Sequence, residues 1–305
     1  MKIHTNINFQ ILWKNMKMQK ANRPQQIQIN GLINSNINTA DIKEFENNIK
    51  FKEIDKINEY LYELKLLKKL RSDAKSKKIP VIDNKTGSFL EIICLLSKPE
   101  KILEVGCGTG YSTYFLLKHF RKIIEKTEIG EKTTDNCPKS FKKVDNESSI
   151  HTSNIIYSYK YSYTGIDLNK DRLSEAKNFI YKIYPDLEMC KSLELNFIGG
   201  NAVKIIPGLR DKFDLVFIDA AKFEYPDYLR ALKGKLKSGC LVIADNIFYC
   251  GKIFGKKISR HDYNSIKGLR EYVILITDSS EFETNFFNTG DGIAVSKYTD
   301  KCLKP

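Results

Sequence analysis

Residues 101–112 read "KILEVGCGTGYS" and join a short apolar run to a turn that contains three glycines. Residues 101–105 predict a buried strand, and the residues after the turn predict a helix. Gly106, Gly108 and Gly110 let the backbone approach a ligand closely, and the N-terminus of the following helix favours anionic groups. This order is typical of a ligand-binding turn in an α/β fold, although the turn alone does not identify the ligand.

The second half of the chain repeats this alternation of strands and helices. Apolar runs predict strands at residues 162–168, 195–200, 213–219 and 240–246. Helices are predicted between them, at 169–184, near Lys204 and at 226–237, and another is predicted from about Thr86, before the glycine turn. Such alternation predicts a mostly parallel sheet with helices on both faces. Residues 283–298, "ETNFFNTGDGIAVSKY", predict two antiparallel strands around a glycine turn, which would add a hairpin to the sheet edge.

Three segments lie outside this pattern. Residues 1–45 are rich in Asn, Gln and Ile without a steady period, and we interpret them as a disordered basic extension. Residues 44–75 have apolar side chains near helical spacing and predict one or two amphipathic helices. Residues 121–160 are polar and rich in turn-forming residues, so they predict an insertion, either a disordered loop or a lid, whose composition favours disorder. The main domain is then expected at 46–302.

The chain of 305 residues carries a formal net charge of +13, and its positive charge is unevenly spread. Residues 1–40 contain no Asp or Glu. A basic surface attracts polyanions such as RNA or acidic membranes, but a basic tail is more often simply solvated. The N-terminus therefore leaves organellar targeting open beside a compositionally biased leader. The expected compartment is otherwise the cytoplasm, and no stretch is apolar enough to predict a membrane span.

The cysteines and histidines do not form a recognisable metal or disulfide pattern. The seven cysteines include no Cys-x-x-Cys pair, and the four histidines include no His-Glu-x-x-His motif. The cysteines are therefore interpreted as reduced packing residues of an intracellular protein.

The side chains around the glycine turn favour one class of cofactor. Tyr111 occupies the place of the third glycine of a dinucleotide fingerprint, which weighs against NAD. Glu104 would repel a pyrophosphate but suits the ammonium group of an amino-acid ligand, and this points to S-adenosylmethionine. Asp167, at the end of the next predicted strand, would accept hydrogen bonds from ribose hydroxyls. Its alternative role is in the start of the next helix, which Asn169 could cap instead.

Two later strands end in polar residues. "FDLVFIDAAKFEY", 213–225, places Asp219 and Lys222 after an apolar run, and "CLVIADNIF", 240–248, ends in Asp245 and Asn246. Taken alone, Asp219 and Lys222 could form an ion pair at the end of a strand, and Asp245 and Asn246 could form a turn. Together, at the carboxyl ends of strands in one sheet, they predict a site.

With these motifs in order, the chain resembles the cation-dependent O-methyltransferases, which include the caffeoyl-CoA and catechol O-methyltransferases. The resemblance covers roughly Ile79 to Tyr298 apart from the insertion, and rests on "KILEVGCGTGYS", "FDLVFIDAAK", "LVIADNIFYCGKI" and "NTGDGIAVS". "FIDAAK" is most similar to the bacterial tRNA 5-hydroxyuridine methyltransferases. The resemblance implies a Rossmann-like fold of the S-adenosylmethionine-dependent methyltransferases, a methyltransferase domain at 46–302, and a homodimer.

The resemblance also implies roles for single residues. Asp219, Asp245 and Asn246 match ligands of a divalent cation such as Mg²⁺. Lys222 would be the general base beside Asp219. The implied cofactor contacts are Ile82, Glu104, Gly106, Gly108, Gly110, Ser112, Asp167, Asn201, Ala202 and Asp219. Asn201 departs from the family's Asp, which predicts an altered contact near the adenine.

Three functions follow as hypotheses. The first is methylation of a hydroxyl beside a second oxygen, as in 5-hydroxyuridine of tRNA. The second keeps the reaction but uses a small catechol or a phenolic acyl-CoA, with Phe223, Phe248 and Tyr249 as pocket walls. The third is a non-catalytic RNA-binding protein with the same fold, against which the retention of Lys222 and of the three metal positions argues.

Overall fold

The computed structural model describes residues 39–131, 160–190 and 192–300. The described chain divides into two compact units, and the boundary between them in the sequence falls between residues 61 and 62. The first unit contains the beginning of helix α2 (Thr39–Ser76), and the second contains its end and all other elements. The predicted amphipathic segment is therefore one continuous helix. It begins at Thr39, so residues 39–45 are helical although they were predicted to be disordered.

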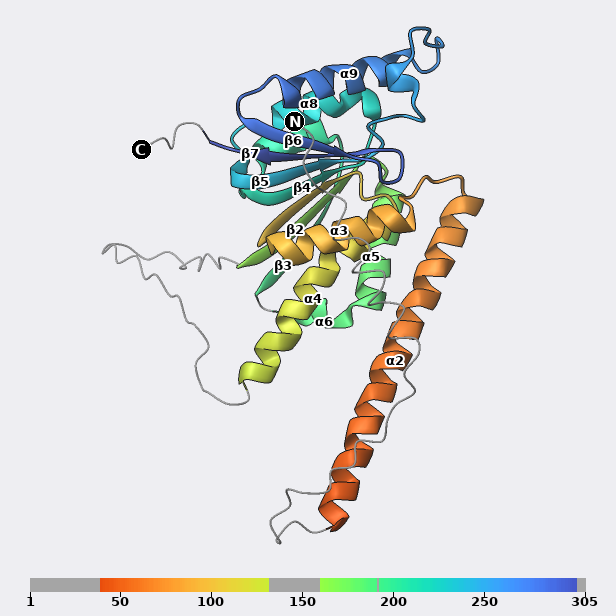
Figure 1. Ribbon diagram of the computed structural model, residues 1–305, viewed down its shortest axis with the longest axis vertical. Helices are drawn as coiled ribbons and strands as arrows, with labels where there is room; N and C mark the ends of the chain where they lie inside the picture. Colours follow the sequence, from red (N-terminus) through yellow and green to blue (C-terminus); the bar gives the residue numbers. More distant parts are fainter. Residues whose placement is uncertain (1–38, 132–159, 191, 301–305) are drawn as a thin grey trace, which may run out of the picture. The chain divides into compact units, whose positions relative to one another are not determined.

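The second unit is built on a seven-stranded sheet with the order β3-β2-β1-β4-β5-β7-β6 (Figure 1). Strands β1 to β5 pair in parallel, and β7 pairs antiparallel with both β5 and β6. The strands are β1 (Lys101–Val105), β2 (Tyr161–Asp167), β3 (Leu193–Gly199), β4 (Phe213–Ile218), β5 (Leu236–Ala244), β6 (Phe282–Phe287) and β7 (Ile293–Tyr298). The prediction of a mostly parallel sheet with a C-terminal antiparallel hairpin is confirmed.

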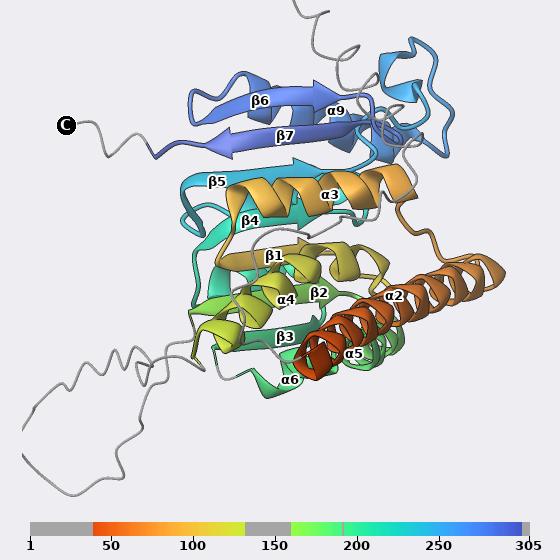
Figure 2. The same cartoon turned by 60° about the horizontal axis from the view of Figure 1, so that its bottom comes forward.

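Helices cover both faces of the sheet, as predicted. Alternate residues of β1 show the two cores, because Ile102 packs on one face and Leu103 on the other. The first face is covered by α3 (Asn84–Ser97), α4 (Tyr111–Glu131), α5 (Lys170–Ile183) and α6 (Pro185–Met189) (Figure 2). The second is covered by α7 (Ala202–Ile205), α8 (Tyr225–Ala231) and α9 (Tyr263–Thr277). Short 3-10 turns form η1 (Ile206–Gly208), η2 (Lys222–Glu224) and η3 (Lys252–Phe254).

The structure differs from the sequence prediction in four helices, of which α6 is a short helix that was not predicted. The helix predicted at 226–237 ends at Ala231, and Gly234 follows with φ +76°, a left-handed conformation that turns the chain into β5. α9 was not predicted, although the structure has a helix there. α4 continues to Glu131, so it includes the first eleven residues of the predicted insertion.

Parts of two predictions lie outside the described residues. Most of the N-terminal extension, 1–38, and most of the insertion, 132–159, are among them. Within the described ranges, no helix is both long enough and apolar enough to cross a membrane.

One close contact between backbones holds η2 in place. Gly268 of α9 lies so close to η2 that a Cβ atom there would stand 2.6 Å from Phe223 Cα and 2.7 Å from the Lys222 carbonyl oxygen. Because backbone atoms cannot turn aside as a side chain can, only glycine fits this contact. The position of Lys222 therefore depends on α9.

We expect Gly268→Ala to destabilise the protein by about 1–3 kcal/mol through overpacking. Urea denaturation measures this change in the free energy of unfolding. Gly208→Ala is the matched control, since a Cβ atom at Gly208 has no neighbour within 4 Å. Equal stability of the two variants would contradict the close packing of α9 on η2.

Candidate functional site

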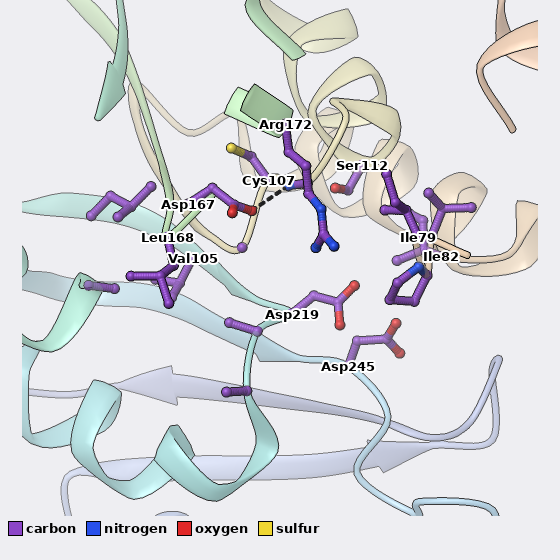
Figure 3. A pocket seen from close by; sticks show the side chains of 18 of the residues that line it. Ile79, Ile82, Val105, Cys107, Ser112, Asp167, Leu168, Arg172, Asp219 and Asp245 are labelled. Atoms are coloured by element: carbon purple, nitrogen blue, oxygen red, sulfur yellow. Dashed lines mark hydrogen bonds between the residues drawn. The ribbon is translucent and has the colours of Figure 1, made fainter. Parts of the chain in front are cut away.

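A cavity of about 430 Å³ lies at the carboxyl ends of β1, β2, β4 and β5 (Figure 3). This is where ligands bind in open α/β sheets. Residues from well-separated parts of the sequence meet here, and most of the predicted site residues are among them. Those that line the cavity are Ile82, Gly106, Gly108, Ser112, Asp167, Asn201, Ala202, Asp219, Lys222, Asp245 and Asn246.

The glycine turn forms one wall of the cavity, and two of its glycines are required for packing. Gly106 has φ +90°, and a Cβ atom there would overlap the carbonyl group of Asp219. Gly110 also has φ +90°, and a Cβ atom would stand 3.0 Å from Ala176 Cα of α5. Gly110 does not line the cavity; it allows the start of α4 to pack on α5. The turn thus joins the ends of β1 and β4 closely.

Asp167 ends β2 and faces the cavity. Its Oδ2 accepts a hydrogen bond from the Gly108 N–H at 2.8 Å, and its Oδ1 accepts one from the Asn169 N–H at 2.8 Å. Asn169 is the N-cap of α5, because its side chain accepts from the N–H groups of Asp171 and Arg172 at 3.0 Å each. The capping role therefore belongs to Asn169, and Asp167 is tied to the glycine turn.

Glu104 lies behind the glycine turn and does not line the cavity. Its carboxylate is completely buried and accepts three hydrogen bonds, from Ser112 Oγ at 2.5 Å, Thr113 Oγ1 at 2.7 Å and Tyr163 OH at 2.5 Å. Burial raises the pKa of Glu104 from 4.5 to about 7, although the three hydroxyl donors oppose that rise. Glu104 is thus connected to the cavity through Ser112.

Gly165 makes room for one of these donors. Tyr163 and Gly165 are two residues apart on β2, so they face the same side of the sheet. A Cβ atom at Gly165 would stand 2.5 Å from Tyr163 OH. The glycine therefore lets the Tyr163 ring lie along the strand and reach Glu104.

Asp219 and Asp245 follow directly after two neighbouring strands. Ile218 of β4 pairs in register with Ala244 of β5, so the next residue of each strand lies beside the other. Figure 3 shows both carboxylates pointing into the cavity. Asp245 is 2% exposed, and burial, followed by the nearby charge of Asp219, raises its pKa to about 7. Two acidic groups here lack a fully compensating positive charge.

Asn246 completes a donor set that fits a hard divalent cation. It has a left-handed backbone with φ +56°, donates its N–H to Asp245 Oδ1 at 2.7 Å, and lines the same cavity. Carboxylate and amide oxygens are ligands that Mg²⁺ and Ca²⁺ accept. No cluster of three or more His, Cys, Asp and Glu side chains suited to a metal occurs in the described part of the chain. The candidate set consists of two carboxylates and one amide.

Lys222 is held by two hydrogen bonds at the same site. Its Nζ donates to Asp219 Oδ1 at 2.8 Å and to Tyr225 OH at 2.8 Å. The buried Tyr225 hydroxyl lies 3.0 Å from the Asp245 carbonyl oxygen, to which it donates. Tyr225 thus connects Lys222 to the end of β5. Apart from its place three residues after Lys222, no local pattern indicates this role.

Arg172 and Asn201 add polar groups to the cavity. Figure 3 shows the Arg172 side chain extending from α5 into the cavity. This residue was not predicted, because it reads as an ordinary charged residue of an amphipathic helix. Asn201 is the N-cap of α7, where its side chain accepts from the Lys204 N–H at 3.3 Å. Its side-chain oxygen thus already has a structural partner.

A second cavity of about 460 Å³ adjoins the first and shares Lys222 and Asn246 with it. Its remaining walls come from the loop after β5, the approach to α9 and the β6–β7 turn. They are Tyr249, Cys250, Lys252, His261, Asp262 and Asp291. Of the aromatic residues predicted to surround an acceptor, Tyr249 lines this cavity, whereas Phe223 is 54% exposed.

Comparison with known proteins agrees with this geometry. Residues 161–298 match the model of a family described as O-methyltransferase. The chain is an O-methyltransferase. A Mycobacteroides abscessus protein that bears the name of an O-methyltransferase is 25% identical over 208 residues, which are 68% of this chain and 76% of that protein. A catechol O-methyltransferase of Niastella koreensis is 23% identical over 61% of this chain and 65% of its own length.

Solved structures of O-methyltransferases share the fold. The Bacillus cereus O-methyltransferase in complex with SAH has a TM-score of 0.56 and 17% identity, and the match covers 77% of this chain and 91% of that one. TomG of Streptomyces achromogenes, in complex with SAM, has a TM-score of 0.56 and 17% identity, with 77% and 90% covered. At these identities the likeness establishes the fold.

The buried Glu104 predicts a pH dependence of the stability of this O-methyltransferase. Its folded-state pKa of about 7 is above its ordinary 4.5, so the folded state binds the proton more tightly than the unfolded state. The associated stability is fully present below about 4.5 and is lost as pH rises towards about 7. The glutamine of the Glu104→Gln variant does not titrate, so the variant lacks this pH-dependent contribution to stability.

We therefore expect the free energy of unfolding of the wild type, minus that of Glu104→Gln, to fall as pH rises over this range, by up to about 3 kcal/mol. Urea denaturation at a series of pH values measures the difference, in which the titration of Asp245 cancels because both proteins contain it. A difference that does not change with pH would show that Glu104 stays ionised throughout.

Proposed function

We propose that this chain transfers a methyl group from S-adenosylmethionine to a hydroxyl that has a second oxygen beside it, with a divalent cation such as Mg²⁺ at the site. The observation that supports this proposal is the convergence of Asp219, Asp245, Asn246 and Lys222 beside the glycine turn in one cavity. The sulfonium group of the cofactor supplies the methyl group, and the O-methyltransferase structures with bound SAH and SAM support this choice.

The chain offers contacts for the ribose, the carboxylate group and the adenine end of the cofactor. Asp167 would accept from the ribose hydroxyls, because each of its oxygens receives only one backbone N–H and retains a free lone pair. Ser112 would bind the carboxylate group by turning its single hydroxyl proton from Glu104 to the ligand. Ile82, Asn201 and Ala202 would surround the adenine end, with Gly106 and Gly108 allowing close backbone approach. Glu104 would act through Ser112.

The metal would be held by Asp219, Asp245 and Asn246. A divalent cation there would stabilise the ionised form of a bound hydroxyl and offset the negative charges of Asp219 and Asp245. Lys222 Nζ is the proposed acceptor of the hydroxyl proton, since it lies at the junction of the two cavities. Tyr225 would keep Nζ in place through its hydrogen bond of 2.8 Å. The acceptor would enter through the second cavity.

The proposed acceptor is 5-hydroxyuridine in tRNA, whose 5-hydroxyl lies beside O4. The net charge of +13 supports a polyanionic partner. A small catechol is the second candidate, supported by the name of the Niastella koreensis relative. Each offers two neighbouring oxygens, so the same site would serve either. A homodimer remains a proposal from the family resemblance.

Methyl transfer from labelled S-adenosylmethionine tests the reaction and the acceptor together. We expect labelling of tRNA that contains 5-hydroxyuridine, dependence on Mg²⁺, and loss of labelling with EDTA, because Asp219 and Asp245 would then lack their cation. Labelling of catechol but not of tRNA would make this a small-molecule enzyme. Labelling that persists fully in EDTA would contradict the role of the metal.

Lys222→Gln is the variant for the same assay. It should lower kcat by roughly 10²–10⁴-fold if Nζ is the general base. Lys233→Gln, at an exposed position after α8, is the matched control. Affinity for S-adenosylhomocysteine, measured by calorimetry, should be similar in both variants. An unchanged kcat in Lys222→Gln would show that another group accepts the hydroxyl proton.

A further inference from the structure

The segment between β5 and α9 and the first turns of α9 carry a group of exposed basic and aromatic side chains. Residues 251–270 contain six Lys and Arg residues and a single acidic residue, Asp262. Phe254 is 73% exposed and Tyr263 is 54% exposed. We call the exposed members of this group the basic rim. They are Phe254, Lys256, Lys257, Arg260, Tyr263 and Lys267.

Two of the six cations stabilise the loop, and four are left for other contacts. Lys252 pairs with Asp262 at 2.9 Å. Arg270 donates to the carbonyl oxygens of Ile253 at 2.9 Å and Gly255 at 2.6 Å. The basic side chains of the rim make no hydrogen bond or ion pair with any other residue in the described ranges. Their charge is therefore not neutralised by the chain itself.

The rim is presented in a fixed shape. The buried Asp262 accepts from Lys252, from Ser259 Oγ at 2.8 Å and from Tyr249 OH at 3.3 Å. The Phe254 ring lies 5.6 Å from that of Phe248. A surface that is already ordered loses less conformational entropy when it binds a partner. The rim is thus prepared for binding rather than merely solvated.

The rim adjoins the second cavity. Lys252, His261 and Asp262, which alternate with the rim residues in the sequence, form walls of that cavity. Lys222 and Asn246 of the proposed catalytic site line the same cavity. Figure 2 shows the loop before α9 at the end of the sheet to which the parallel strands point. A chain bound along the rim could therefore place one of its groups in the cavity.

We propose that the basic rim binds a single-stranded RNA segment that carries the acceptor nucleoside, an inference that rests on the proposed function. Lys256, Lys257, Arg260 and Lys267 pair with phosphate groups, and Phe254 and Tyr263 stack on bases. The nucleoside to be methylated enters the second cavity beside Lys222. Exposed aromatic rings among cations favour RNA over an acidic peptide, because every base has a face that can stack.

The test is fluorescence anisotropy of a short labelled single-stranded RNA with the full chain, titrated with salt. The Lys256→Glu/Lys257→Glu double variant should weaken binding by roughly tenfold or more and reduce the slope of log affinity against log salt by about 1.4, from about 0.7 per lost phosphate contact. Phe254→Ala should weaken binding with little change in the slope. The matched control is Lys182→Glu/Lys233→Glu, which changes the net charge equally at two exposed positions away from the rim.

The control should bind RNA within about twofold of the wild type, because contacts rather than net charge hold the strand. Equal loss in both double variants would overturn the proposal. So would a rim double variant that retains RNA binding but loses binding to phosphatidylserine vesicles, since the rim would then face a membrane. Similar affinity for S-adenosylhomocysteine in all variants shows an intact fold. If RNA binding depends on the rim but no methyl transfer occurs, the proposed function is rejected, whereas the proposal that the rim binds RNA still holds.

Discussion

The parallel register of β4 and β5 is the constraint on which the site depends. Because Ile218 pairs with Ala244, the two residues that follow, Asp219 and Asp245, end neighbouring strands side by side. Asp245 is buried there, and its pKa is raised by that burial and then by Asp219. Two acids so placed are costly unless a cation lies near them. The pairing of β4 and β5 thus places two carboxylates where a nearby positive charge would stabilise them.

The surrounding elements are arranged around that point. Gly106 allows the glycine turn to touch the backbone of Asp219, which brings the turn and the acids into one cavity. Lys222 supplies one positive charge, and it is held by Tyr225 from within and by the packing of Gly268 on η2 from outside. Lys222 also lines the second cavity. The two cavities therefore suit a reaction between two ligands that meet at Lys222.

Much of this arrangement could be predicted from local sequence patterns. The apolar run at 101–105 and the three glycines defined a strand and a turn, and the bounds of β1 and the start of α4 agree with the prediction. Asp219, Asp245 and Asn246 could be placed together because the carboxyl ends of parallel strands share one edge. α9 was missed although Ile266, Leu269, Tyr272 and Ile276 form its buried face. Its basic residues hid that periodicity. The roles of Tyr163, Gly165, Arg172 and Tyr225 depend on contacts between distant segments, and no local pattern contains them.

The most direct test of the central claim is the binding of a divalent cation itself. Free Mn²⁺ can be measured by electron paramagnetic resonance during titration of the wild type, Asp245→Asn and Asp262→Asn, the last being a buried acid whose charge is already paired with Lys252. We expect the wild type and Asp262→Asn to bind Mn²⁺ alike and Asp245→Asn to lose this binding. Equal binding by all three proteins would contradict the claim that Asp219 and Asp245 form the cation site.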